Sequence, residues 1–517
     1  GGGGNDSPRP ASQRAAAFIL TAAMLTALTA PAFAETWYIE DGDITISAGK
    51  DGNDVTQKGE TTYGDKDTVI TNHDKDKASS NTVTIEAEDK DDKVEVTLKD
   101  LNIDASRGSE AAVSVTGKGD TNIELDGDNE LKGGDRHAGL EHNQTVDGEG
   151  NVTSGKLTIQ DDKNNAGSLT ATGGQFAAGI GGASANAGQV TITGGTITAT
   201  GEDGAGIGGG QGNKGTNAGN ADIEISGGTI EATGGYASAG IGGGNWGDAN
   251  IKITGDAVIK NATGGAFGAG IGGGGGGNGD VTISGNAKIE NAQGGFTGSG
   301  IGGGNGASGT VTIKDDSTVT ATGGEAGTGI GGGYAGLGDV TIEGNTTVNA
   351  TGGVGSAGIG GGVDSVNDAA GNGNKITIKG NESGSPTVKA VGGGTNKENQ
   401  VFIGGAGIGS GAGDAKANIT LEGKVTIVAK AGEGNAAIGD RNGEQVFTGL
   451  DGSITRYDSE GNNITLPTDP GYPVPADTSS SGGGSADASV QESVFPGLVV
   501  TDKDGQRISY TSTQSGN

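Results

Sequence analysis

The sequence contains no cysteine, few aromatic residues and fewer apolar residues than most folded chains. The absence of cysteine excludes a disulfide framework and a cysteine-ligated zinc site. Hydrophobic residues make up 31% of the 517 residues and aromatic residues 3%, whereas a globular domain has about 45–50% apolar residues. Because such a composition is typical of disordered chains, a folded structure must place its few apolar side chains at regular positions.

Positive charge is also scarce. The chain has 32 lysine and arginine residues against 64 aspartate and glutamate residues, which gives a formal net charge of −32. This charge repels nucleic acid and anionic membrane surfaces and attracts cations. We therefore expect no nucleic-acid partner, direct binding of neutral glycans, and binding of acidic glycans only through bridging Ca²⁺.

Glycine, by contrast, is abundant, with 113 residues, and much of it belongs to a repeat. Each copy has a Val/Ile-Thr-Ile segment, a polar turn, a Thr-Ile/Val-x-Ala-Thr segment, Gly-Gly and then Ala-Gly-Ile-Gly-Gly-Gly. Full or degraded copies of this last phrase are centred on Ile180, Ile207, Ile241, Ile271, Ile301, Ile330, Ile359, Ile408 and Ile438. From Ile241 to Ile359 the spacing is about thirty residues, a period found in solenoids and propellers.

The copy that contains Ile330 shows which side chains would face inward. Val311 and Ile313 alternate with Thr312, and residues 318–322 alternate in the same way, as half-buried strands do. Ile330 supplies a third inward position. A propeller blade would instead show about four antiparallel strands joined by hairpins. We therefore predict a parallel β-solenoid, whose coils stack about 4.8 Å apart.

The changing regularity of the repeat divides the chain into six segments. We expect a signal peptide at residues 1–34, irregular acidic N-terminal coils and a cap at 35–155, regular glycine-rich β-helix repeats at 156–448, a closing segment at 449–466, a linker at 467–488, and the start of a further module at 489–517.

The first of these segments predicts export. Arg9 and Arg14 precede an apolar run at residues 15–30, and Ala32-Phe33-Ala34 matches a cleavage site. A run of about sixteen residues is short for a membrane span, which needs about twenty. We expect a secreted or cell-surface protein whose mature chain has no membrane span.

Six of the few aromatic residues occupy related places in the repeat. They follow Gly-Gly after the second strand (Phe176, Tyr236, Phe267 and Phe296) or Gly-Gly-Gly after the third (Trp246 and Tyr334). One interpretation is a strip on which sugar rings of a polysaccharide stack. The other is a structural ladder in which the rings pack on one another, since stacked aromatic pairs gain about 0.5–1.5 kcal/mol without a ligand.

Two groups of carboxylates are candidate calcium ligands. They are Asp89, Asp91 and Asp92, and Asp126, Asp128 and Glu130. Closely spaced carboxylates on turns can ligate Ca²⁺, which takes six to eight oxygens. The second group does not match an EF-hand, and solvated surface charge is the alternative for both groups.

An enzyme is the main rival class. A lyase or hydrolase on this scaffold needs a positioned base or an acid pair, and the basic candidates are Arg107, Arg136 and the three histidines His73, His137 and His142. Because regular repetition leaves little room for a single catalytic site, we expect no enzyme. A structural stalk that presents a distal module is a further alternative.

Several segments together resemble a known family. They are Gly-Asp-Thr-Asn-Ile-Glu-Leu-Asp-Gly-Asp-Asn-Glu-Leu-Lys-Gly-Gly at 119–134, Ala-Gly-Leu-Glu at 138–141, Lys-Leu-Thr-Ile at 156–159, Gly-Ser-Leu-Thr-Ala-Thr-Gly-Gly at 167–174 and the repeated Ala-Gly-Ile-Gly-Gly-Gly. Between residues 37 and 448 the chain is similar to carbohydrate-binding-domain proteins exported by Gram-positive anaerobes.

The resemblance implies a right-handed parallel β-helix related to polysaccharide lyases, with bound calcium and a plant or cell-wall polysaccharide as partner. We therefore expect an all-β fold, a right-handed parallel β-helix (solenoid) with three short strands per coil of about 30 residues. The expected function is that of a non-catalytic carbohydrate-binding or adhesin protein that holds polysaccharide on a β-helix face.

Overall fold

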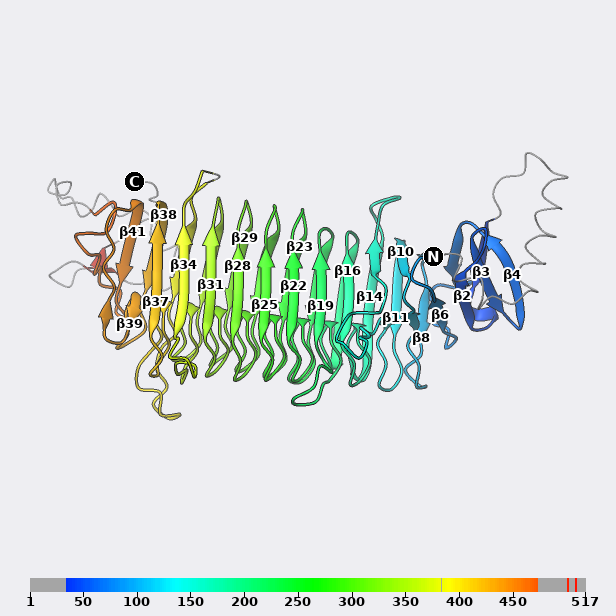
Figure 1. Ribbon diagram of the computed structural model, residues 1–517, viewed down its shortest axis with the longest axis horizontal. Coiled ribbons are helices and arrows are strands. Elements are labelled where there is room, and N and C mark those ends of the chain that lie inside the picture. Colours follow the sequence, from blue (N-terminus) through cyan, green and yellow to red (C-terminus); the bar gives the residue numbers. More distant parts are fainter. Residues whose placement is uncertain (1–33, 383, 473–499, 502–506, 509–517) are drawn as a thin grey trace. The chain divides into compact units, whose positions relative to one another are not determined.

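The computed structural model describes residues 34–382, 384–472, 500–501 and 507–508 (Figure 1). Almost all of the predicted signal peptide, residues 473–488 of the predicted linker and most of the predicted further module lie outside these residues. The chain divides into two compact units, Gly1–Asn250 and Ile251–Asn517, which we call the N-terminal and C-terminal units. Strand β22 (Ala249–Ile253) includes the boundary.

From β7 onward each coil contributes one strand to each of three faces, which we number in the order in which the chain visits them. In the N-terminal unit the first face contains β1 (Glu35–Tyr38), β5 (Thr68–Thr71), β7 (Lys93–Lys99), β10 (Asp120–Asp126), β13 (Leu157–Gln160), β16 (Gly188–Ile192) and β19 (Ala221–Ile225). The second face contains β8 (Asn102–Asp104), β11 (Asp128–Lys132), β14 (Ser168–Ala177), β17 (Thr196–Asp203) and β20 (Thr229–Thr233).

The third face of the N-terminal unit is made of shorter strands. It contains β2 (Ile44–Ala48), β6 (Val83–Glu86), β9 (Val113–Thr116), β12 (Leu140–Glu141), β15 (Ile180–Gly181), β18 (Ile207–Gly208) and β21 (Ile241–Gly242). Leu140 pairs with Ile180 and Ile180 with Ile207. The irregular coils before residue 155 therefore supply strands to the same three sheets as the regular repeats.

The C-terminal unit has the same three faces. Its first face contains β25 (Gly279–Ile283), β28 (Gly309–Ile313), β31 (Gly338–Glu343), β34 (Asn374–Lys379) and β37 (Ala417–Glu422). Its second face contains β23 (Val258–Thr263), β26 (Lys288–Gln293), β29 (Thr318–Thr322), β32 (Thr347–Thr351), β35 (Thr387–Val391), β38 (Lys424–Lys430) and β41 (Asp451–Tyr457). Its third face contains β24 (Ile271–Gly272), β27 (Ile301–Gly302), β30 (Ile330–Gly331), β33 (Ile359–Gly360), β36 (Ile408–Gly409) and β39 (Ile438–Asp440).

The parallel register places equivalent apolar side chains above one another. Ile271 pairs with Ile301, and Ile301 pairs with Ile330. All three side chains are fully buried, and on the first face Val311 and Ile313 are buried while Thr312 is partly exposed. The predicted all-β solenoid of three short parallel strands per coil is confirmed, and a small apolar content suffices because each inward position repeats.

Glycine is required where the third strand ends. Gly302 has a φ of +135°, and a Cβ at this position would overlap the carbonyl oxygen of Gly331 in the next coil. On the other side of the strand, the amide of Ser299 donates to the carbonyl oxygen of Gly303 at 3.1 Å within the same coil. The chain thus turns sharply on both sides of a single buried isoleucine, Ile301. The turn after Ile301 requires a residue without a side chain, and Gly302 supplies it.

Antiparallel strands end the third face in both units. In the N-terminal unit β3 (Asn53–Gln57) pairs antiparallel with β2, and β4 (Glu60–Asp65) with β3, after a short 3-10 helix (Ile39–Asp41). In the C-terminal unit β40 (Gly443–Glu444) pairs antiparallel with β39. Caps of this kind protect a solenoid from adding foreign strands at its edge. Farther along, β42 (Val500–Thr501) and β43 (Arg507–Ile508) form a separate antiparallel pair.

Buried ionic contacts hold the C-terminal cap. The guanidinium of Arg456 is fully buried and forms two bonds with the carboxylate of Asp469, at 2.9 and 2.8 Å. A third bond, of 3.1 Å, joins it to Glu444, whose carboxylate also accepts the amides of Ala437 and Ile438. The closing segment predicted at 449–466 thus contains β41 and Arg456. The charged network joins Arg456 to Glu444 of β40 and to the buried Asp469, which lies within the predicted linker.

Three loops share the sequence Asp-x-x-Gly-Asn and the same turn. The loops begin at Asp147, Asp368 and Asp458. In each loop, one carboxylate oxygen of the aspartate accepts hydrogen bonds from two main-chain amides, those of the second and fourth residues after it, at 2.8–3.0 Å. The main-chain amide of the aspartate donates to the carbonyl oxygen of the final asparagine. The glycine has a φ of 85–89°, which the turn requires and other residues rarely adopt.

Candidate functional site

The turns on either side of the third strand lie together at one edge of each coil. We call these turns, for example residues 323–328 and 332–336 around Ile330, the glycine corner. The amide of Tyr334 donates to the carbonyl oxygen of Thr297 in the preceding coil at 2.9 Å, and the amide of Asn305 donates in the same way to Phe267 at 2.8 Å. The side chains of the glycine corner are therefore carried on turns that main-chain hydrogen bonds hold in place.

The six aromatic residues predicted as a strip all lie on the glycine corner of their own unit. In the N-terminal unit Tyr236 is 57% exposed and Trp246 38%, and in the C-terminal unit Phe296 is 50% exposed. Phe176, Phe267 and Tyr334 are half-buried. The three exposed rings contribute little to the core and are accessible from solvent.

The four aromatic residues that follow Gly-Gly occupy two different positions in the coil. Tyr236 and Phe296 lie five residues before the isoleucine of their coil, whereas Phe176 and Phe267 lie four residues before it. The earlier position is exposed and the later one is half-buried. The predicted single row after Gly-Gly is therefore two rows with different access to solvent.

Trp246 has a backbone conformation that a large side chain rarely adopts. Its φ is +66°. The equivalent position, five residues after the isoleucine, has a positive φ in the coils that carry Ala185, Gly276, Gly306, Ala335 and Asp364 there. A bulky residue at such a position is strained, and strained residues tend to be found at functional sites.

Two of these aromatic rings have a cation above them. The ammonium of Lys214 lies 5.4 Å from the centre of the Trp246 ring, and the guanidinium of Arg136 lies 5.3 Å from the centre of the Phe176 ring. Both cations are exposed. Lys214 was not among the residues predicted from the sequence, where the only signal for it is the longer interval between Ile207 and Ile241, which predicts an insertion.

Tyr334 is held differently. Its hydroxyl donates to the carboxylate of Asp364 at 2.8 Å. This bond, with a smaller effect of burial, raises the pKa of the Tyr334 hydroxyl, because the phenolate would face a carboxylate. The exposed edge of this ring therefore presents a neutral hydroxyl next to an acid.

The second predicted calcium group does not lie on one turn. Asp126 ends β10 on the first face, while Asp128 and Glu130 belong to β11 on the second face. Each carboxylate has its own partner. Asp126 accepts a hydrogen bond from the side-chain amide of Asn164 at 2.8 Å, and Asp128 accepts one from the hydroxyl of Ser168 at 2.7 Å. The carboxylate of Glu130 lies 3.6 Å from the ammonium of Lys132.

The first predicted calcium group lies on the turn before β7. The buried carboxylate of Asp92 accepts the amide of Asp89 at 2.9 Å, while Asp91 is exposed. Within the part of the chain that the structure describes, no three histidine, cysteine, aspartate or glutamate side chains are grouped so that they could hold a metal ion. Neither predicted group is therefore brought together as a calcium site.

The three histidines that were candidates for catalysis all have local partners. His142 is buried, and its two ring nitrogens lie 2.9 and 2.7 Å from the carbonyl oxygens of Val115 and Gly155. His73 stacks on the ring of Tyr38 with centroids 3.8 Å apart. The Nδ1 of His137 lies 2.8 Å from the buried carboxylate of Glu141.

The His137–Glu141 pair makes stability depend on pH. The hydrogen bond with Glu141 raises the pKa of His137 above its ordinary value of 6.5, against a smaller opposite effect of burial. Because the pKa is higher in the folded chain, the stabilisation is complete below about pH 6.5 and is lost as the pH rises through the folded-state value. We expect His137→Gln to lower the urea midpoint more at about pH 5.5 than at about pH 8.5. An equal loss at both pH values would contradict this coupling.

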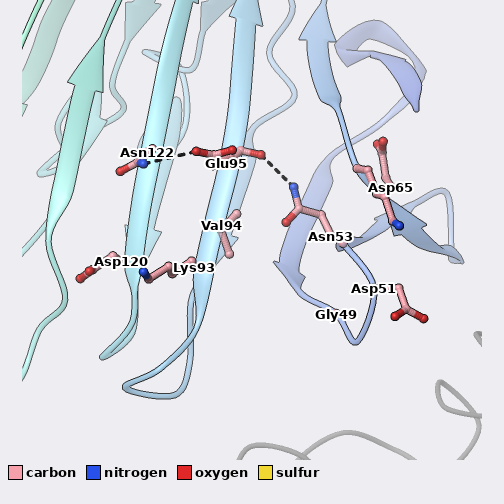
Figure 2. A pocket seen from close by; sticks show the side chains of 11 residues that line it. Gly49, Asp51, Asn53, Asp65, Lys93, Val94, Glu95, Asp120 and Asn122 are labelled. Carbon is pink, nitrogen blue, oxygen red and sulfur yellow. Dashed lines mark hydrogen bonds between the residues drawn. The ribbon is translucent and has the colours of Figure 1, made fainter. Parts of the chain in front are cut away.

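A polar depression of about 610 Å³ lies in the N-terminal unit, beside β3, β7 and β10. Figure 2 shows Asn53 and Asn122 on either side of Glu95. Asn53 donates to the Glu95 carbonyl at 2.8 Å, and Asn122 lies 3.5 Å from its carboxylate. Lys66 and Lys93 add positive charge to the lining. This depression could not be predicted from the sequence, because its residues come from three separate coils.

Comparison with known proteins supports the architecture. Five segments match a family model described as Beta helix repeat, at residues 164–184, 190–211, 223–245, 311–334 and 340–363. No curated protein and no solved structure matches the chain. Among the described residues, no helix has the length and apolar character that a membrane crossing needs. The matched repeats and the three parallel sheets in each unit together identify the chain as a parallel β-helix protein.

Proposed function

We propose that this chain is an exported, non-catalytic protein that binds polysaccharide on the glycine corner of its coils, at or near a cell surface. The observation that carries the proposal is the exposure of aromatic side chains on turns fixed by main-chain hydrogen bonds. Tyr236, Trp246 and Phe296 are the most exposed of these rings. An aromatic face suits the apolar face of a sugar ring, and a rigid turn limits the entropy lost on binding.

Trp246 supports a binding role more strongly than a packing role. Small residues occupy the equivalent position in other coils, including Ala185 and Ala335. A tryptophan there strains the backbone and leaves a large ring partly exposed, so packing alone does not explain its presence. A ligand that stacks on the ring would account for both features.

The contacts of the basic residues favour binding over catalysis. A general base needs a free lone pair within reach of the substrate. Both nitrogens of the buried His142 face carbonyl oxygens, and Nδ1 of His137 faces Glu141. His73 forms a stack with Tyr38. The buried His142 is therefore unavailable to a substrate, which supports a protein that holds a glycan without cleaving it.

Retention on insoluble polysaccharides tests the proposal. Cellulose, xylan, pectin and peptidoglycan would be incubated with the purified protein, with and without calcium. We expect the Tyr236→Ala/Trp246→Ala and Phe296→Ala variants to bind the retained glycan about threefold to tenfold more weakly, since each loses a stacking surface. Ala185 and Ala335 already adopt a positive φ at the equivalent position, so the loss in Trp246→Ala should not come from unfolding.

Tyr472→Ala is the matched control, because Tyr472 is 45% exposed but follows β41, outside the turns of the glycine corner. It should bind like the unmodified protein. If the strip variants are retained as well as the control, the glycine corner is not the binding surface. If no glycan in the panel retains the unmodified protein, polysaccharide binding itself is excluded for these ligands.

A further inference from the structure

The geometry points to anionic saccharides, such as uronate chains, as the ligands of the glycine corner of the N-terminal unit. Each would be held by an aromatic ring and a cation together, without a bridging metal ion. This inference rests on the proposed function and names the ligand class. It also differs from what the net charge of −32 alone suggests, because binding depends on the charges that touch the ligand rather than on their sum over the chain.

The two pairs of ring and cation belong to one continuous part of the surface. The amide of Arg136 donates to the carbonyl of Gln175, next to Phe176, at 3.1 Å. The amide of Gln211 donates to the carbonyl of Phe176, and that of Gly212 to the carbonyl of Asn245, next to Trp246, each at 2.9 Å. Main-chain hydrogen bonds thus join the turns that carry both pairs. Successive coils are about 4.8 Å apart, so one extended chain can contact both rings.

Lys214 is available to a ligand anion. Although acidic residues outnumber basic ones two to one in this chain, no carboxylate lies within ion-pair distance of the Lys214 ammonium among the residues that the structure describes. Its contact is the Trp246 ring. Among the described residues, the carboxylate that lies within ion-pair distance of Arg136 is that of the exposed Asp135, at 3.9 Å. Both cations can therefore pair with an incoming carboxylate without breaking a strong ion pair.

The cation above each ring discriminates between ligands. A neutral sugar that stacks on this face of Trp246 must displace the Lys214 ammonium, and the cation–π attraction is lost. A uronate that stacks in the same place gives the displaced ammonium a carboxylate partner. The same reasoning applies to Arg136 above Phe176, where a guanidinium can bind a carboxylate with two hydrogen bonds. The site therefore favours the charged sugar over its neutral form.

Polygalacturonate and its methyl ester form a matched pair of probes, since they share one backbone and differ in charge. Binding of the purified protein to each immobilised polymer would be measured in the presence of EDTA, which removes calcium. We expect tighter binding to polygalacturonate than to the ester. The Arg136→Gln/Lys214→Gln variant should bind polygalacturonate about tenfold more weakly and the ester within about twofold of the unmodified protein.

Two further variants separate local contacts from overall charge. Lys260→Gln/Lys288→Gln also removes two positive charges, from exposed positions on β23 and β26, and should leave binding unchanged. Arg136→Lys/Lys214→Arg keeps both charges and should restore most of the affinity for polygalacturonate.

The outcomes distinguish this inference from the proposed function. Equal or tighter binding to the ester, or binding to polygalacturonate only when calcium is added, overturns the inference and leaves polysaccharide binding intact. An equal loss in the control variant also overturns it, since the effect would then come from net charge. Failure to bind either polymer, together with binding of neutral glycans in the retention panel, overturns the inference alone. Failure on every glycan overturns both.

Discussion

Replacing Gly302 with alanine is expected to destabilise the C-terminal unit by about 3 kcal/mol or more. The substitution meets two obstacles: φ is +135°, and the new Cβ would overlap the carbonyl oxygen of Gly331. Overpacking typically costs about 1–3 kcal/mol, and an unfavourable φ adds about 1–2 kcal/mol. Because the backbone of the next coil cannot move without breaking its own strand bonds, we expect a lower unfolding temperature and faster hydrogen exchange at the amides of Ile301 and Gly303.

Gly306→Ala is the control for this experiment. Gly306 also has a positive φ, of +72°, but no atom lies within 4 Å of a Cβ placed there. The equivalent position in the next coil is already an alanine, Ala335, with a φ of +57°. We expect this variant to lose about 1 kcal/mol at most. Equal losses in the two variants would show that contact with Gly331 does not limit the stacking of coils.

Asp469→Asn is expected to cost about 3–5 kcal/mol, because it leaves the buried guanidinium of Arg456 without its main counter-charge. Arg456 is 0% exposed and has two bonds with Asp469. Its remaining charged partner, Glu444, also has to accept two main-chain amides. Urea unfolding followed by circular dichroism should show a lower midpoint, with the earliest hydrogen exchange in β41 and β39.

An exposed pair in the same unit provides the comparison. Arg441 and Asp414 are 2.7 Å apart, and both side chains are exposed. Asp414→Asn makes the same chemical change and should cost less than about 1 kcal/mol, because water screens this pair. A similar loss in the two variants would contradict the view that burial gives the Arg456 network its importance.

The sequence predicted the coil well because each inward position is repeated. Val311, Ile313 and Ile330 could be assigned to the core from alternation alone, since their equivalents in other copies share the same neighbours. The exposure of the aromatic rings was harder to predict, because the same sequence pattern places them at two positions that differ by one residue. Gly-Gly precedes both Tyr236 and Phe267, yet these residues are five and four positions from the buried isoleucine, and only the shape of the turn decides which ring is exposed.

The candidate site was harder to predict because its parts come from different coils. Lys214 is 32 positions from Trp246, and no local periodicity connects an inserted loop to a ring in another coil. Arg136 and Phe176 both lie four residues before the apolar residue of their third strand, Leu140 or Ile180, but the repeat alone does not predict that the cation lies above the ring. The calcium prediction failed to group its residues for a related reason. Residues 126–130 looked like one acidic turn, but Gly127 is the corner between two strands, so the carboxylates belong to two faces.

The Asp-x-x-Gly-Asn hairpins have a consequence for how such a chain can diversify. The hairpin that begins at Asp368 lengthens its coil, yet Val340 still pairs with Ile376 and Ile342 with Ile378. The extra residues are closed off by their own turn and do not displace the strands that follow. Because closing a longer surface loop costs little free energy, new recognition elements can be acquired at these points, one coil at a time, while the scaffold beneath them stays in register.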